Sequence, residues 1–236
     1  NWCFLGLYDY VSNFLWSFPL LIMKYSVVLP AAGSGSRMNL GYNKVYYPVK
    51  GRALLAYTID VFEKDEDCTD ITVVTDIETF KKEMQSEAFK KVSVVSGGAT
   101  RQESIYHGLQ NVKEEIVMIH DGARPHITLA LLDKLKEAME TEKGAILMVP
   151  CKDTIKVVEN NYIVKTIPRE TLMAAQTPQV FYTKDIMYCM QKAINENFVG
   201  TDDASLIERY LDIKVAAVLG DYNNLKVTTP EDLKDI

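Results

Sequence analysis

Segments with the apolar pattern of buried strands alternate with segments of helical periodicity along most of this chain. The expected strands cover residues 25–29, 70–75, 92–95, 116–120 and 145–149, and the expected helices cover residues 53–64, 77–90, 101–112 and 129–141. Strands that alternate with helices imply crossover connections and a mostly parallel sheet flanked by helices. The sequence therefore predicts a Rossmann-like α/β fold. Because such crossovers are right-handed, the carboxyl ends of the strands should lie on one side of the sheet.

A loop of small residues follows the first expected strand, where open α/β sheets place a ligand. It reads Pro30-Ala31-Ala32-Gly33-Ser34-Gly35-Ser36-Arg37-Met38 and leads on to Lys44. Small side chains let backbone N–H groups approach an anion closely, and the start of the next helix adds its positive dipole end. The loop matches neither a dinucleotide fingerprint nor a Walker loop. Arg37 and Lys44 add two full charges, so we interpret it as a triphosphate site; a tight turn with solvated cations is the alternative.

Two more unusual loops follow later strands. Ser96-Gly97-Gly98-Ala99-Thr100-Arg101 comes after the third expected strand, and His120-Asp121-Gly122-Ala123-Arg124-Pro125 comes after the fourth. We expect both to lie beside the small-residue loop, at the carboxyl ends of the strands. There Asp121 can hold Mg²⁺ against substrate phosphates, and Arg124 can bind a second phosphate. The alternatives are a helix cap or Asx-turn at Asp121 and a plain turn at Gly97-Gly98.

The strand–helix alternation breaks after residue 150. Residues 153–158 and 162–166 alternate like two strands around Glu159-Asn160-Asn161, which predicts a hairpin. A ribbon of this kind has little core of its own, and a symmetric dimer that exchanges these arms would cover it. Residues 224–232 predict a strand, a cap at Thr229 and a helix that begins at Pro230. On that strand, Lys226 is a third candidate for the anion pocket or else a solvated lysine.

Charge and composition exclude several function classes. The formal net charge of −6 argues against a general nucleic-acid binder, although a nucleotide pocket needs only a few local cations. The four cysteines and three histidines have no zinc-site or metalloprotease spacing. Scattered thiols favour a cytoplasmic protein with reduced cysteines.

Residues 1–22 differ from the rest of the chain. They are rich in Trp, Phe, Leu and Tyr, and Asp9 is their one charged residue. They lack the basic region and small-residue cleavage site of a secretory signal. We expect an extraneous or upstream-translated leader, with a membrane-surface anchor or an added core element as alternatives. Residues 23–236 are then expected to form a single domain with no membrane partner and with a dimerisation arm at about 151–172.

Seven motifs, taken in order, resemble the 2-C-methyl-D-erythritol 4-phosphate cytidylyltransferases of the non-mevalonate isoprenoid pathway. The resemblance runs from about Lys24 to the C terminus. Besides the three loops already described, it is carried by Asp153-Thr154-Ile155-Lys156, Gln176-Thr177-Pro178-Gln179, Thr201-Asp202-Asp203-Ala204-Ser205 and Lys226-Val227-Thr228 with Pro230-Glu231-Asp232. It implies a fold of the nucleotide-diphospho-sugar transferase type, CTP as a substrate, Mg²⁺ and a homodimer. The implied reaction joins CMP from CTP to the sugar phosphate and releases pyrophosphate.

The resemblance also implies roles for individual residues. The cations that stabilise the transition state and the leaving pyrophosphate would be Arg37, Lys44 and Lys226. CTP would be bound through the backbone of Ala31, Ala32 and Gly33, with its cytosine read by Gly98 and Ser104. Mg²⁺ would be held by Asp121. The sugar phosphate would be contacted by Arg124 and Thr154, and by Arg169 and Thr177 from the neighbouring subunit's arm.

The chain departs from the family pattern at three places. Asn43-Lys44-Val45 replaces the common Pro-Lys-Gln, Ala99 replaces an acidic residue, and Gly122 stands where alanine is usual. Three other functions compete with the one that the resemblance implies. The first is ribitol 5-phosphate cytidylyltransferase, a sister family with the same loops. The second is a different sugar-phosphate nucleotidyltransferase that uses UTP or GTP. The third is a non-catalytic nucleotide-binding module, which predicts the loss of Arg37, Lys44 or Asp121, whereas all three are present.

Overall fold

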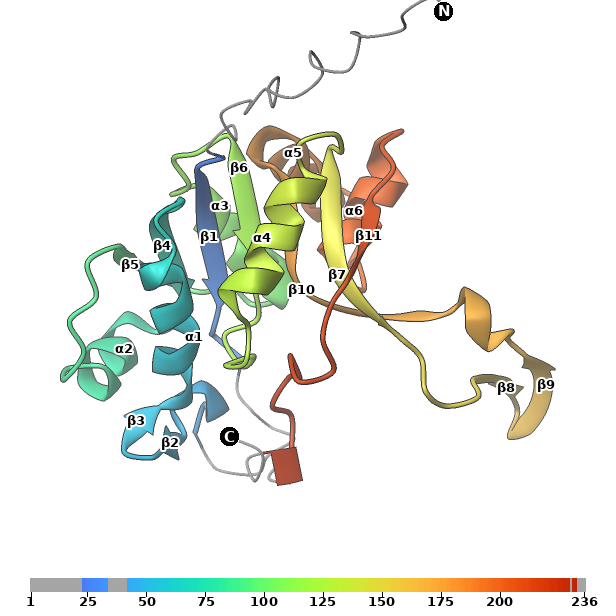
Figure 1. Ribbon diagram of the computed structural model, residues 1–236, viewed down its shortest axis with the longest axis horizontal. Helices are drawn as coiled ribbons and strands as arrows, with labels where there is room; N and C mark the ends of the chain where they lie inside the picture. Colours follow the sequence, from blue (N-terminus) through green and yellow to red (C-terminus); the bar gives the residue numbers. More distant parts are fainter. Residues whose placement is uncertain (1–22, 34–41, 230, 233–236) are drawn as a thin grey trace, which may run out of the picture.

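The computed structural model describes residues 23–33, 42–229 and 231–232, and its core is a seven-stranded sheet (Figure 1). The strands are β1 (Tyr25–Pro30), β4 (Cys68–Val74), β5 (Val92–Val95), β6 (Ile116–Ile119), β7 (Gly144–Pro150), β10 (Met173–Tyr182) and β11 (Ala216–Leu219). Their spatial order is β11-β7-β10-β6-β1-β4-β5. Within this sheet only β10 runs antiparallel to its neighbours, β6 and β7. The predicted mostly parallel sheet is confirmed.

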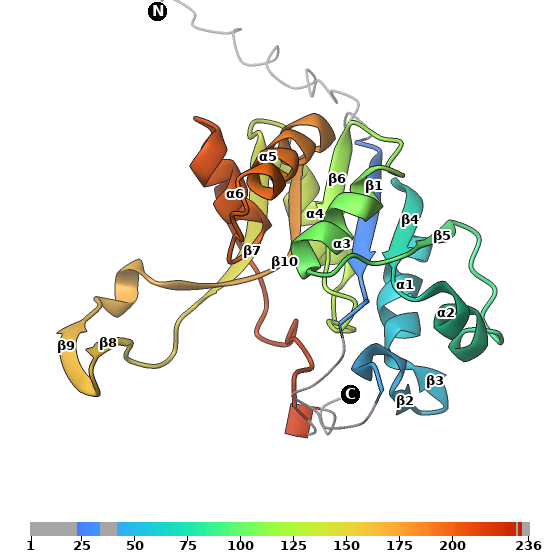
Figure 2. The same ribbon diagram turned by 180° about the vertical axis from the view of Figure 1, so that it is seen from behind.

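Helices cover both faces of the sheet. Helices α1 (Leu54–Lys64) and α4 (Leu129–Ala138) lie on one face (Figure 1). Helices α3 (Arg101–Leu109), α5 (Thr183–Asn195) and α6 (Asp203–Tyr210) lie on the other (Figure 2). Successive residues of β1 alternate between the two apolar cores, since Val27 and Leu29 pack with α1 and α4 whereas Val28 packs with α3 and α5.

The register of the sheet places three loops side by side. Val28 of β1 lies opposite Ile119 of β6, and Pro30 lies opposite Val74 of β4. Val74 in turn lies opposite Val95 of β5. The loops after β1, β5 and β6 therefore start from neighbouring points on the same edge, as the parallel topology predicts.

Helix α2 (Ile77–Glu83) is shorter than the predicted helix over residues 77–90, so that prediction is wrong at its end. Beyond residue 84, contacts with distant parts of the chain replace the hydrogen bonds of the helix. Glu87 forms an ion pair with Arg52, at 2.6 Å, and Glu63 accepts hydrogen bonds from the backbone N–H groups of residues 90 and 91. These contacts draw the chain toward β5.

A hairpin of β8 (Lys156–Glu159) and β9 (Tyr162–Thr166) extends away from the main sheet, followed by the 3₁₀ turn η3 (Arg169–Thr171) (Figure 1). The predicted hairpin is confirmed. All its residues are exposed, including the apolar side chains of Val157, Val158, Tyr162, Ile163 and Val164. We call residues 151–172 the arm.

The remaining elements are small, and some expectations fall outside them. The 3₁₀ turn η2 (Lys44–Tyr46) and the two-residue strands β2 (Pro48–Val49) and β3 (Arg52–Ala53) follow the first loop. The strand predicted around Lys226 is wrong: this segment is irregular and is fastened by a hydrogen bond from Val227 N–H to the Ala123 carbonyl. The expected leader and most of the expected C-terminal helix lie outside the described residues. Within those residues, no helix is both long and apolar enough to cross a membrane.

Candidate active site

A cavity of about 500 Å³ lies where the three loops meet. Its walls come from the loops after β1, β5 and β6, from the start of η2, and from the segment around Lys226. Eight of the predicted site residues line it: Ala31, Ala32, Gly33, Lys44, Gly98, Ser104, Asp121 and Lys226. The structure thus brings these eight residues, from widely separated loops, together at one cavity, and their roles there stay predictions.

Asn43 ties the turn that carries Lys44 to the small-residue loop. Its side-chain amide donates a hydrogen bond to the Ala31 carbonyl, while its side-chain oxygen caps η2 by accepting from Val45 N–H. The ammonium group of Lys44 donates to the Val227 carbonyl at 2.6 Å. The departure from the family pattern at residue 43 therefore leaves the lysine at the cavity and supplies its turn with a cap.

The loop after β5 packs against the small-residue loop as closely as glycine allows. A Cβ atom on Gly97 would lie 2.6 Å from that of Ala32, closer than two carbon atoms can approach without a shift. The Ser104 hydroxyl accepts from Gly98 N–H at 3.0 Å and donates to the Thr100 carbonyl at 2.9 Å. Glu103, which the sequence interpretation left out, accepts from the N–H of residue 99 at 2.8 Å. Both side chains fix the shape of this wall.

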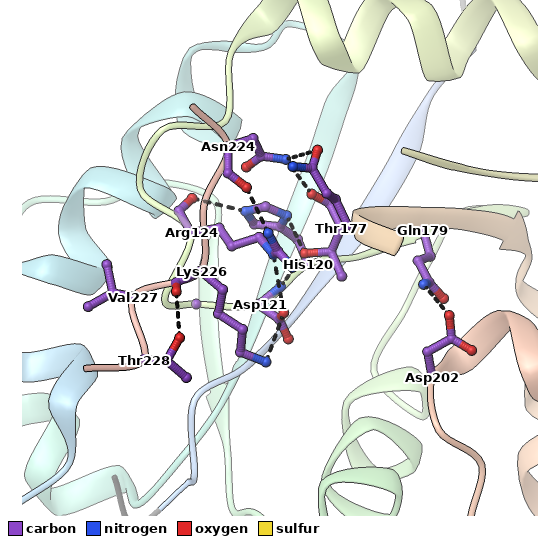
Figure 3. Close-up of polar contacts among 12 residues, drawn as sticks. His120, Asp121, Arg124, Thr177, Gln179, Asp202, Asn224, Lys226, Val227 and Thr228 are labelled. Atoms are coloured by element: carbon purple, nitrogen blue, oxygen red, sulfur yellow. Dashed lines mark hydrogen bonds and ion pairs between the residues drawn. The ribbon is translucent and has the colours of Figure 1, made fainter. Parts of the chain in front are cut away.

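Asp121 is the electrostatic centre of the cavity. Its Oδ2 lies 3.0 Å from Lys226 Nζ and 3.3 Å from Arg124 Nε (Figure 3). Its Oδ1 lies 3.8 Å from an Arg101 nitrogen. Burial by itself would raise the pKa of this carboxyl, but the charges of Lys226, Arg101 and Arg124 hold the pKa well below its usual range. Asp121 is therefore ionised at neutral pH, with three cations directed at it.

A second layer of polar groups supports Asp121. Thr177 Oγ1 accepts from Asp121 N–H at 3.0 Å and lies 3.0 Å from His120 Nδ1, while His120 Nε2 lies 3.2 Å from the Arg124 carbonyl oxygen. Arg124 donates to the Asn224 carbonyl at 2.7 Å, and the Asn224 side chain donates to the Thr177 carbonyl at 2.9 Å (Figure 3). Burial lowers the pKa of His120 to about 4, so its ring is neutral at pH 7.

The expectation that Thr177 reaches a neighbouring subunit's site from the arm is wrong. Thr177 lies in β10, where that strand passes between β6 and β7, and it is buried beside Asp121 of its own chain. The misassignment arose because the arm and β10 are continuous in sequence. The chain re-enters the main sheet at Met173, four residues before Thr177.

Arg101 and Asp203 form an ion pair at the rim of the cavity. The two terminal nitrogens of Arg101 donate to the two carboxylate oxygens of Asp203 at 3.1 and 2.9 Å. Asp203 is only 1% exposed, and burial raises its pKa despite the opposing charge of Arg101. Both residues lie in the motifs that resemble the family, but no role was assigned to them from the sequence. A signal that could have found them is their position, because each is a charged residue at the start of a helix, α3 for Arg101 and α6 for Asp203.

Besides Thr177, three predicted site residues lie outside the lining of the cavity. Thr154 and Arg169 line a separate hollow at the base of the arm, and Arg169 donates to the carbonyl of residue 152 at 3.1 Å. Arg124 is buried behind Asp121 and does not line the main cavity. Arg37 lies outside the described residues, so its role stays a prediction.

Comparison with known proteins identifies the family. The family model for 2-C-methyl-D-erythritol 4-phosphate cytidylyltransferase matches residues 25–235. The chain belongs to this family. The cytidylyltransferase of Halalkalibacterium halodurans is 45% identical over 216 residues, covering 89% of this chain and 94% of the relative. That of Geotalea uraniireducens is 43% identical over 220 residues, covering 89% and 94%.

Solved structures of family members share the fold. The 4-diphosphocytidyl-2C-methyl-D-erythritol synthase of Anaerococcus prevotii superposes with a TM-score of 0.80 at 31% identity, covering 90% of this chain and 94% of the other. The cytidylyltransferase of Francisella tularensis gives a TM-score of 0.78 at 29% identity, covering 89% and 97%. The resemblance drawn from the seven motifs is thereby confirmed, and the chain is an enzyme of the nucleotidyltransferase class.

Proposed function

We propose that the cavity binds CTP and transfers its CMP group to 2-C-methyl-D-erythritol 4-phosphate, giving 4-diphosphocytidyl-2-C-methyl-D-erythritol and pyrophosphate. The observation that carries this proposal is the convergence of Lys226, Arg124 and Arg101 on the ionised Asp121 at the wall of the cavity. Such a site suits a reaction between two anions. Membership of the cytidylyltransferase family supports the choice of substrates.

The reaction needs no protein nucleophile. A phosphate oxygen of the sugar phosphate attacks the α-phosphorus of CTP, and a new P–O bond forms as the bond to the bridging α–β oxygen breaks. The electron pair of the broken bond leaves with pyrophosphate. Negative charge accumulates around the reacting phosphorus, so catalysis consists of positioning and charge neutralisation.

The residues divide this work by location. The backbone at Ala31, Ala32 and Gly33 offers N–H groups to the phosphates, with Arg37 expected nearby. Lys44 and Lys226, which both line the cavity, neutralise the triphosphate and the leaving pyrophosphate. The wall formed by Gly98 and held by Ser104 faces the base.

Asp121 is the proposed ligand for Mg²⁺. Within residues 23–33 and 42–229, no group of three or more His, Cys, Asp or Glu side chains could hold a metal without a substrate. An ionised carboxylate in a phosphate-binding cavity suits Mg²⁺, which commonly binds to one or two carboxylates together with substrate phosphates. When bound, the ion supplies additional positive charge that neutralises and orients the phosphates.

We also propose a homodimer in which the arms are exchanged. The exposed apolar side chains of the arm support this, because a two-stranded ribbon has too little core to stand alone. Thr154 and Arg169 lie together on the arm, so an exchange would deliver both to the partner's cavity. The buried free thiols of Cys68 and Cys189 support a cytoplasmic location.

The arm exchange is tested by complementation. Arg169→Ala and Lys226→Met proteins, each inactive as a homodimer, are mixed, allowed to exchange subunits and assayed for pyrophosphate release. Recovery is expected, because one cavity of each mixed dimer would receive an intact arm and hold an intact lysine. No recovery, when mixed dimers are demonstrated by differently tagged subunits, would refute the exchange.

The reaction is tested by pyrophosphate release from CTP and Mg²⁺, with 2-C-methyl-D-erythritol 4-phosphate and ribitol 5-phosphate in parallel. We expect release with the first substrate alone, and none from Asp121→Asn protein. Release with ribitol 5-phosphate alone would assign the sister activity to the same cavity. CTP binding without release from either polyol phosphate would support a non-catalytic nucleotide-binding module.

A further inference from the structure

The hydrogen bonds behind Asp121 form a closed ring whose three supporting side chains, His120, Thr177 and Asn224, do not line the cavity. His120 and Asn224 are fully buried, and Thr177 is 5% exposed. The ring joins the loop after β6, strand β10 and the segment that leads to Lys226. It therefore links every chain segment that supplies a charge to the Asp121 cluster except helix α3.

The chemistry at two points fixes the direction of the bonds through His120. The backbone N–H of Asp121 can only donate, so Thr177 Oγ1 accepts from it and retains its own proton for His120 Nδ1. The Arg124 carbonyl can only accept, so His120 Nε2 must carry the proton that reaches it. For a neutral imidazole, a single arrangement satisfies all three contacts: the proton lies on Nε2, and the bare Nδ1 accepts from the Thr177 hydroxyl.

We propose that His120 and Thr177 are positioning residues, and that the Nε2–H tautomer of His120 holds the Asp121 and Arg124 backbones in the arrangement that cytidylyl transfer requires. The proposal rests on the proposed function, because it assigns importance to Asp121 through its role in that reaction. Thr177 then contributes through Asp121 of its own chain. Neither side chain is proposed to touch CTP or the sugar phosphate.

The ring acts at both ends of the Asp121–Arg124 loop. At one end, Thr177 satisfies the N–H of Asp121 and sets the direction in which its carboxylate leaves the backbone. At the other end, His120 holds the Arg124 carbonyl while the Arg124 side chain reaches Asn224, two residues before Lys226. Loss of one link would leave a buried donor or acceptor unsatisfied, and the loop would shift to restore it.

The first test is the tautomer itself, measured in the wild-type protein. Nitrogen-15 labelled histidine and a long-range proton–nitrogen correlation spectrum at pH 7.5 distinguish the Nε2–H form, the Nδ1–H form and the imidazolium. The His120 signals are assigned by their loss in a His120→Gln sample. We expect the Nε2–H form; either of the other two forms would overturn the proposal, whatever the activity of the enzyme.

The second test compares Thr177→Val with its matched control Thr177→Ser. Serine keeps both hydrogen bonds, whereas valine removes the acceptor for Asp121 N–H and the donor for His120 at nearly constant volume. We expect Thr177→Val to lower kcat by about 10- to 100-fold, the range that follows from an unsatisfied buried donor. The Kd for CTP should change far less than kcat, because the base-facing wall lies outside the ring of hydrogen bonds.

A purely structural role gives a different pattern. It would lower the melting temperature of Thr177→Val while leaving kcat of the folded protein equal to that of Thr177→Ser, and that result would overturn the proposal. If Thr177→Val does not fold, the comparison uses His120→Asn, which retains an acceptor near Thr177 but loses the donor to Arg124. Equal kcat in that variant and the wild type would overturn it as well. A wild-type enzyme that releases no pyrophosphate would refute the proposed function and leave the tautomer result standing.

Discussion

Replacement of His120 should remove a specific part of the protein's sensitivity to acid. The imidazole of His120 is fully buried and makes an edge-to-face contact with Phe62, with the centroids of the two aromatic rings 5.4 Å apart. Burial lowers its pKa to about 4 in the folded protein, whereas an unfolded chain gives histidine a pKa of about 6.5. The folded state therefore binds this proton less readily than the unfolded state.

The sign and size of the effect follow from linkage. Well above pH 6.5 the imidazole of His120 is neutral in both states, and the stability that it contributes is fully present. As pH falls from about 6.5 to about 4, His120 binds a proton in the unfolded chain but not in the folded protein, and the free energy of unfolding decreases. The gap between the two pKa values corresponds to a loss of about 3 kcal/mol in the free energy of unfolding. Asp121, whose pKa lies well below its usual range, loses its own contribution only at lower pH.

The assay is urea unfolding followed by circular dichroism, in half-unit steps from pH 7.5 to pH 4, for the wild type, His120→Asn and His120→Gln. Both variants lose hydrogen bonds of the closed ring behind Asp121, so they should be less stable than the wild type at pH 7.5. That difference should shrink by about 3 kcal/mol as pH falls to 4. A difference that stays constant across the range, for both variants, would show that His120 titrates alike in the folded and unfolded states and would refute the reasoning.

Three further predictions concern the cavity and its rim. Lys226→Met should lower kcat by about 100- to 1000-fold in a pyrophosphate-release assay, because it removes a charge that lies 3.0 Å from Asp121, whereas Thr228→Ser should not. Arg101→Leu should lower the free energy of unfolding by about 3 kcal/mol, because it leaves the buried Asp203 carboxylate unpaired, and the double variant Arg101→Leu/Asp203→Leu should recover stability without recovering turnover. Recovery of both would assign the pair a structural role alone. Gly97→Ala should raise KM for CTP, because its Cβ would lie 2.6 Å from that of Ala32 and the cavity wall would have to shift.

The placement of the main loops was predictable because it depends on topology. Parallel strands leave their carboxyl ends at one edge, so residues as distant in sequence as Ala31, Gly98 and Asp121 had to meet there. Lys226 could be assigned to the same cavity only through the resemblance to the family, because the strand expected around it does not form. The motif thus assigned the lysine to the right cavity. It did not predict the local structure, because that structure depends on tertiary contacts that the motif does not encode.

The errors have a common physical cause. Helix α2 ends early because the Glu63 carboxylate accepts hydrogen bonds from the backbone N–H groups of residues 90 and 91, while the side chain of Glu87 pairs with Arg52. Thr177 was assigned to the neighbouring subunit's site through the family resemblance, and its motif does not reveal that the chain has re-entered the main sheet at Met173. In both cases the deciding partners lie far away in sequence. Local patterns contain no information about them.

Two residues that support the site, His120 and Asp203, lie inside motifs that resemble the family, yet the sequence did not show that they are supporting residues. His120 precedes Asp121, and Asp203 lies beside the aspartate that caps α6, yet neither position in the sequence distinguishes a group that reacts from one that holds it. Burial makes the distinction: Lys44 and Lys226 line the cavity, whereas His120 and Asp203 are almost completely enclosed. Because an enclosed polar group must be satisfied by fixed partners, its replacement perturbs the geometry of the exposed charges. The strongest effects of mutation at this site should therefore extend beyond the residues that can touch a substrate, into the ring behind Asp121.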